Sequence, residues 1–213
     1  MVKPKNSTAK QKKLPIEDST TEEKIKQAAR HVFTRKGFAA TRTRDIAEEA
    51  GLNLALLNYY FRSKEKLFDL IMLENMQHFM HGMKTILNNE NSTLSQKTVE
   101  FVDNYINLLK SQPDLPLFIL HELKANPQKF AENIGVKKVL FESHFFKQIN
   151  EATKGKINPF QLIINMMALT VFPFIACPLL KSIGNLKQVE FDSLMDERRT
   201  MIPLWIHSML KIK

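Results

Sequence analysis

Residues 41–68, TRTRDIAEEAGLNLALLNYYFRSKEKLF, constrain the fold more than any other stretch, because two short helices have to meet there at a tight turn. Apolar residues between Ile46 and Ala50 recur at the spacing of one buried helical face. Gly51 can adopt the positive φ of a helix C-terminus, and Asn53 stands where a second helix needs an N-cap oxygen. The stretch therefore predicts a helix-turn-helix, whose second helix is held out from the body.

The second helix, which follows Asn53, is apolar on nearly every side although it is too short to span a core. We expect Leu57, Tyr60 and Phe61 to pack inside. The residues then left on the outward face are Leu54, Ala55, Leu56, Asn58 and Tyr59. An outward apolar face beside positive charge suits the thymine methyl groups and sugar edges of a DNA major groove. The alternative is an ordinary helical hairpin buried in a bundle, because short helix pairs are common.

The segment AEEAGLNLALLNYYFRSKEKLF resembles the DNA-binding domain of the tetracycline-repressor (TetR) family of bacterial transcription regulators. The positions that agree with the family pattern are, in order, Ile46, Ala47, Ala50, Gly51, Leu57, Tyr60, Phe61, Lys64, Glu65 and Leu67. An ordered match of this length is far more specific than a single glycine motif. The resemblance implies a regulator whose second helix enters the major groove.

Four positions depart from that pattern, and two of them concern DNA recognition. Leu52 and Asn53 are conservative replacements for the family's Val and Ser. Ala55 replaces a Gly, and Asn58 replaces a Tyr that commonly contacts a phosphate in the family. Because Asn58 is shorter and suited to a base edge, we expect Tyr59 to take over the contact with the DNA backbone. The resemblance thus implies the docking mode and leaves the operator sequence open.

Two arginines at the start of the first helix of the pair also indicate DNA as the partner. We expect Thr41 or Thr43 to cap this helix, with Arg42 and Arg44 in its first turn. Cationic side chains at a helix N-terminus oppose the helix dipole, which is a mild cost. That cost is explained if a phosphate binds at the same helix end. Solvated arginines are the alternative. The resemblance implies that Lys64, or its backbone N–H, also contacts a phosphate. The residues expected to contact DNA are Arg42, Thr43, Arg44, Asn53, Leu54, Ala55, Leu56, Asn58, Tyr59 and Lys64.

The formal charge of +9 is concentrated near this motif. Residues 1–70 hold 15 Lys and Arg against nine Asp and Glu, and a basic excess of this kind favours nucleic acid as a partner. Five lysines precede residue 14 without an apolar stretch behind them, so no secretory signal is expected. We interpret residues 1–18 as a disordered basic tail, which either grazes phosphates or is simply solvated.

The remaining pattern predicts an all-α chain, because only six glycines occur and no strand-like alternation is sustained. A capping box at Thr20 and Glu23 starts a first helix at about residues 21–36, and Ser63 starts a long one that ends near residue 88. Helical spacing predicts about nine helices, of which the last five are expected at 94–111, 114–125, 128–153, 159–183 and 187–211. We assign residues 19–65 to a helix-turn-helix DNA-binding domain and residues 66–213 to a helical effector-binding and dimerisation domain.

The last two helices carry more apolar surface than one chain is expected to cover. Residues 160–180 are long enough to cross a bilayer, but polar residues and prolines interrupt them, so we expect no membrane partner. We expect both helices to form half of a four-helix homodimer interface, with burial inside one core as the alternative. Dimerisation also suits DNA, because a two-fold pair of recognition helices reads a palindrome.

The middle helices are rich in Met and Phe, which adapt to an apolar guest. Most of these side chains are equally explained as plain core, and Cys177 is interpreted as a small core residue. The residues expected to bind a ligand are Phe101, Tyr105, Phe118, His121, Phe141, His144, Phe145 and Met166. His78 and His81 alone do not indicate a metal site, so we expect none, and no cofactor motif is present.

Together these features predict a cytoplasmic, sequence-specific DNA-binding regulator. We expect a homodimeric repressor that binds double-stranded DNA at a palindromic operator and is released by a small apolar or amphipathic effector. The alternative is a helical small-molecule-binding protein or enzyme without a DNA-directed function. The sequence contains no Gly-rich phosphate loop and no evident nucleophile and base pair, so we expect no catalytic residues.

Overall fold

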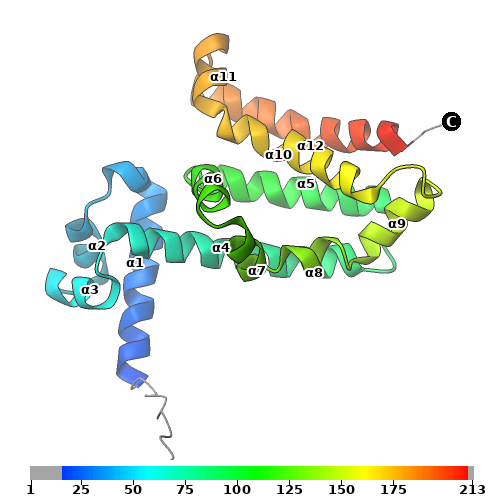
Figure 1. Cartoon of the computed structure of the whole chain (residues 1–213). Coiled ribbons are helices and arrows are strands. Elements are labelled where there is room, and N and C mark those ends of the chain that lie inside the picture. Colours follow the sequence, from blue (N-terminus) through cyan, green and yellow to red (C-terminus); the bar gives the residue numbers. More distant parts are fainter. Residues whose placement is uncertain (1–15, 211–213) are drawn as a thin grey trace, which may run out of the picture. The chain divides into compact units, whose positions relative to one another are not determined.

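The structure is a computed structural model that describes residues 16–210, with side chains described from residue 20 onward. Within that range all regular structure is helical (Figure 1). The chain divides into two compact units, residues 1–67 and residues 68–213. The basic tail expected at residues 1–18 lies outside the described residues up to residue 15, and residues 16–18 belong to the first helix.

The N-terminal unit consists of three helices and the start of a fourth. They are α1 (Ile16–Ala40), α2 (Thr43–Ala50), α3 (Leu54–Phe61) and the beginning of α4 (Lys64–Asn88). Their core contains side chains that are fully buried, namely Ile25, Ala29, Val32, Ile46, Leu57 and Leu67. Because α1 begins before Thr20, the capping box expected there is wrong. Gly37, with φ 74° and ψ 163°, kinks α1 close to the predicted end of the helix.

The C-terminal unit contains the rest of α4 and eight further helices. These are α5 (Leu94–Ser111), α6 (Leu115–Ala125), α7 (Pro127–Ile134), α8 (Val136–Leu140), α9 (His144–Ala152), α10 (Pro159–Ile175), α11 (Cys177–Gly184) and α12 (Gln188–Leu210). The α5 helix is central, since it packs against α9, α10 and α12. Figure 1 shows α5, α10 and α12 running side by side within this unit.

The prediction of about nine helices is wrong, because residues 16–210 form twelve. The helix expected at 128–153 is three helices: Gly135 takes the left-handed conformation (φ 66°), and the Ser143 hydroxyl accepts a hydrogen bond from the Phe146 N–H at 3.2 Å to start α9. The helix expected at 159–183 is two, α10 and α11, bent by 66°. Pro178 lies just after this bend. Proline interrupts a continuous helix here, because it lacks an N–H and its ring clashes with the preceding helical turn.

None of the described helices alone is both long enough and apolar enough to cross a bilayer; α10 and α11 meet these criteria only as a bent pair, by length and composition.

Candidate functional site

The turn between α2 and α3 has the geometry that the sequence predicts. Gly51 ends α2 in the left-handed conformation (φ 66°, ψ 31°), and its N–H donates to the Glu48 carbonyl at 3.1 Å. The Asn53 side chain accepts a hydrogen bond from the Leu56 N–H at 2.8 Å and so caps α3. These local contacts satisfy the backbone groups at both helix ends, and the prediction of a helix-turn-helix is confirmed.

The α3 helix divides into a buried and an exposed face, largely as expected. Leu57 and Phe61 are buried and Tyr60 is half-buried. Tyr59 is 77% exposed, and Ala55 and Asn58 are exposed beside it. The other two outward positions, residues 54 and 56, are half-buried at the edges of this face. The helix therefore presents one aromatic ring and one amide side chain to solvent on an otherwise small surface.

The start of α2 presents two cationic side chains. Arg42 is the N-cap and Arg44 follows in the first turn, and both are exposed. Neither guanidinium forms an ion pair with any residue between 20 and 210. The prediction that Thr41 or Thr43 caps α2 is wrong, because the buried Thr41 hydroxyl donates to the Gly37 carbonyl at 2.7 Å. Both arginines are thus available to an anion near the helix N-terminus.

Acidic residues of α2 are neutralised by bases of α1. Asp45 lies 3.1 Å from the Lys36 ammonium, and its carboxylate also accepts the Arg42 N–H at 2.9 Å. These two contacts, the backbone hydrogen bond first, hold the pKa of Asp45 below its usual value. Glu49 is hydrogen-bonded to His31 at 2.6 Å and lies 3.4 Å from Arg35, and both contacts lower its pKa. Two of the three acidic side chains of α2, Asp45 and Glu49, are therefore balanced locally, which favours an anionic partner for this surface.

Lys64 has a structural contact that the sequence did not predict. Its ammonium donates to the carbonyls of Phe38 and Thr41, each at 3.0 Å, and lies 4.2 Å from the centre of the Phe38 ring. The side chain therefore ties the start of α4 to the link between α1 and α2. Its backbone N–H is in the first turn of α4, where helices leave donors without an intrahelical acceptor. Of the two phosphate contacts expected for Lys64, the one through the backbone fits this geometry better.

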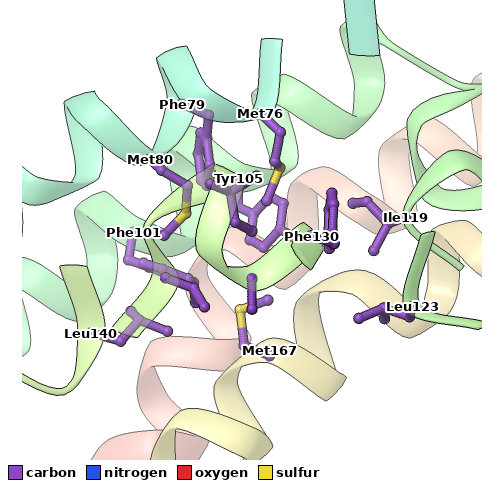
Figure 2. A pocket seen from close by; sticks show the side chains of 13 residues that line it. Met76, Phe79, Met80, Phe101, Tyr105, Ile119, Leu123, Phe130, Leu140 and Met167 are labelled. Carbon is purple, nitrogen blue, oxygen red and sulfur yellow. The ribbon is translucent and has the colours of Figure 1, made fainter. Parts of the chain in front are cut away.

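An apolar cavity lies in the C-terminal unit. Its volume is about 170 Å³, and it is lined by side chains from α4, α5, α6, α7, α8 and α10 (Figure 2). The lining residues are Met76, Phe79, Met80, Phe101, Tyr105, Ile119, Leu123, Phe130, Ala131, Ile134, Val136, Leu140 and Met167. A concave, mostly apolar hollow of this kind is the usual form of a small-molecule site.

Two of the eight residues expected to bind a ligand, Phe101 and Tyr105, line this cavity. The other six lie elsewhere in the unit. Buried core positions hold Phe118, Phe145 and Met166, whereas Phe141 is exposed. The side chain of His121 is 70% exposed and lies 3.6 Å from Glu122. Neither of the two histidines expected to bind a ligand, His121 and His144, lines this cavity.

His144 has a different partner. Lys97 is fully buried, and its ammonium is hydrogen-bonded to His144 Nδ1 at 2.8 Å and to Gln148 Oε1 at 2.9 Å. Burial lowers the pKa of Lys97, because it disfavours the charged form. The cluster joins α5 to α9. A lysine in a helical pattern is typical of an exposed position, so the sequence did not predict the contacts of Lys97 with His144 and Gln148.

The cavity residues contributed by α4 were also missed. Met76, Phe79 and Met80 lie on the apolar stripe of that helix, and helical spacing alone does not distinguish such residues from plain core. Clustering of several methionines on one stripe was the available signal, because flexible thioether side chains line adaptable surfaces.

Comparison with known proteins agrees with the geometry of the α2–α3 segment. Residues 25–71 match the family model of bacterial regulatory proteins of the tetR family. A probable HTH-type transcriptional regulator of Bacillus subtilis (strain 168), YttP, is 25% identical over 133 residues, which are 62% of this chain and 64% of that protein. The match thus spans slightly less than two thirds of the relative's length.

Two solved structures share the fold. A regulator of the TetR/AcrR family from Thermobifida fusca has a TM-score of 0.62 at 13% identity, over 86% of this chain and 97% of that one. FadR from Bacillus subtilis, in complex with stearoyl-CoA, has a TM-score of 0.56 at 16% identity, over 84% of this chain and 96% of that one. The family match contains the whole of α2, the turn and α3, so residues 25–71 are similar to bacterial regulatory proteins of the tetR family over the complete helix-turn-helix.

Proposed function

We propose that this protein is a sequence-specific DNA-binding transcriptional regulator that acts as a homodimer. The observation that carries the proposal is the exposed face of α3, with Asn58 and Tyr59 turned to solvent. On the preceding helix, the guanidinium groups of Arg42 and Arg44 are exposed and form no ion pair with the described side chains. A major groove admits a helix with such a face, and arginine forks bind the flanking phosphates. In this proposal the chain works in the cytoplasm, binds DNA and a small molecule, and catalyses no reaction.

The exposed apolar side chains of α10, α11 and α12 support a homodimer. Ten large ones are exposed on these helices, namely Phe160, Ile164, Phe172, Leu179, Ile183, Val189, Leu194, Met201, Leu204 and Met209. Exposed apolar side chains gathered on three consecutive helices favour an interaction site, and a second copy would bury them in a two-fold bundle. Residues 191, 195, 202 and 206 of α12 already face the protomer's own core, so the outward residues remain for the partner.

The effector is assigned to the cavity in the C-terminal unit. The α4 helix begins in the N-terminal unit at Lys64 and carries Met76, Phe79 and Met80 of the cavity lining. A ligand that favours one position of α4 would favour one of two states of the dimer. In that state the distance between the two recognition helices would not match the spacing of successive major grooves. The dimer would then release DNA, and repression would be relieved.

Selection of bound fragments from random double-stranded DNA tests the proposal most directly. We expect a palindrome with half-sites about one helical turn apart, because two-fold related helices read two-fold related sequences. Enrichment of a single asymmetric half-site would contradict the homodimer, and no enrichment at all would contradict the DNA-binding function.

A further inference from the structure

The cavity offers almost no polar contact to a guest. Among its thirteen lining side chains, only Tyr105 carries an oxygen or nitrogen atom. No lysine, arginine, aspartate, glutamate or histidine lines it. A charged group placed inside would lose its hydration without gaining a partner, which strongly disfavours ionic ligands.

The Tyr105 hydroxyl is the polar group that a guest would meet. The residue is only 1% exposed, with its ring 4.7 Å from that of Phe79 and 5.7 Å from that of Phe101, measured between centroids. Within residues 20–210 no hydrogen bond of its hydroxyl is found, and the residue is part of the cavity lining. Burial raises the pKa of Tyr105, so the group stays protonated and can donate.

The size of the hollow limits the guest. A volume of about 170 Å³ is close to that of engineered apolar cavities, roughly 150 Å³, which stay dry and bind benzene. A single ring with a small substituent therefore fills the space. Because the Tyr105 hydroxyl is a donor without an acceptor among the described residues, the substituent should carry a hydrogen-bond acceptor.

We propose that the cavity binds an uncharged, largely apolar molecule about the size of one substituted aromatic ring, whose single hydrogen-bond acceptor meets the Tyr105 hydroxyl. The assignment rests on the proposed function, since this molecule would be the effector. It deepens that function by naming the ligand's chemical class: neutral, compact and with one acceptor, rather than a long acyl chain or a charged compound.

Calorimetric titration with two molecules of matched shape tests this inference. Acetophenone has a ketone oxygen where α-methylstyrene has a methylene group, so the pair differ mainly in the acceptor. The quantity to measure is the ratio of their two Kd values in the wild type and in Tyr105→Phe. We expect the substitution to reduce the preference for acetophenone about 5- to 10-fold, the effect of one buried hydrogen bond. Benzoate, which is similar in size but charged, should bind more weakly than acetophenone in both proteins.

An unchanged ratio in Tyr105→Phe would overturn the role of the hydroxyl. Tighter binding of benzoate or of stearoyl-CoA than of acetophenone would overturn the ligand class. Ala131→Leu provides a second variant, because filling the cavity should abolish acetophenone binding while the Tm of the unliganded protein shows that the fold persists. Retained binding in this variant would place the ligand elsewhere.

DNA selection in the absence of ligand separates this inference from the proposed function. A palindrome selected by a protein that binds none of these compounds would refute the ligand class and leave the regulator standing. Tyr105-dependent binding by a protein that selects no DNA would do the opposite.

Discussion

At the scale of single residues, the contacts of Lys64 distinguish a structural role of its ammonium group from a role in DNA binding. The family pattern places a lysine at this position and implies a phosphate contact, whereas the ammonium group already bonds two carbonyls of its own unit. No sequence spacing predicts a hydrogen bond to Phe38, because the acceptor is a backbone oxygen 26 residues away that is brought close only by the fold. Stability and DNA affinity should therefore respond to different substitutions.

The first prediction concerns Lys64→Met. Loss of two charge-assisted hydrogen bonds and of the contact with the Phe38 ring should destabilise the protein by about 1–3 kcal/mol. The measurement is urea unfolding followed by circular dichroism. The control is Arg44→Gln, which should leave the unfolding midpoint nearly unchanged and reduce the slope of log K against log salt concentration by about one. Equal midpoints for both variants would contradict the structural role of Lys64.

A second prediction at this scale concerns the exposed face of α3. Tyr59→Ala should weaken binding to every selected sequence by a similar factor, because the ring is assigned to the sugar-phosphate backbone. Asn58→Ala should instead change which base is preferred at one position of each half-site, with about 1–3 kcal/mol of discrimination lost there. Binding measured on a library of single-base operator variants distinguishes the two. Uniform loss from both substitutions would refute the assigned roles.

At the scale of helices, the local signals predicted the DNA-binding segment well and the C-terminal unit less well. Gly51 and Asn53 act on their own neighbours, so the bounds of α2 and α3 follow from a few residues. The break between α10 and α11 also has a local cause in Pro178, which a long apolar run concealed. The cavity could not be predicted in the same way, because its walls come from six helices whose packing is a tertiary property.

Helix α10 contains a proline whose missing hydrogen bond is replaced from another helix. Pro173 cannot donate to the carbonyl four residues earlier, that of Leu169. The Arg198 guanidinium of α12 donates to this same oxygen at 2.7 Å and lies 5.3 Å from the Trp205 ring. Burial lowers the pKa of Arg198, because it disfavours the charged guanidinium. The arginine thus stabilises a kink-prone helix and fixes α10 against α12.

The third prediction is a double-mutant cycle at this contact. Arg198→Met should destabilise the protein by about 1–3 kcal/mol, because it leaves the Leu169 carbonyl without its donor. In a Pro173→Ala background the same substitution should cost less, since the N–H of residue 173 can then bond that carbonyl. Thermal unfolding of the four proteins measures the coupling. Additive effects would show that Arg198 does not substitute for the missing helical donor.

At the scale of the whole molecule, the distribution of exposed apolar residues separates the proposed dimer interface from ordinary surface. The large exposed side chains of α10, α11 and α12 belong to three consecutive helices, and the outward residues of α12 include Leu194, Met201 and Leu204. The α6 helix also exposes Leu117, Leu120 and Leu123, on one short helix. The sequence predicted surplus apolar surface at the C-terminal end, but only coordinates distinguish the residues that one protomer buries from those it leaves outside.

An exposed leucine of α6 serves as the control for a substitution on α12. Leu204 and Leu117 are 65% and 62% exposed, so a glutamate at either position meets similar solvation in the isolated chain. Leu204→Glu should convert the dimer to a monomer in analytical ultracentrifugation, because a carboxylate would be buried against the partner without a counter-ion. It should also remove cooperative binding to the palindrome, since each half-site would then be read by a separate chain. Leu117→Glu should stay dimeric with the Tm of the wild type. A dimer in both variants would place the interface on another surface, whereas a monomer in both would show that α6 contributes to it.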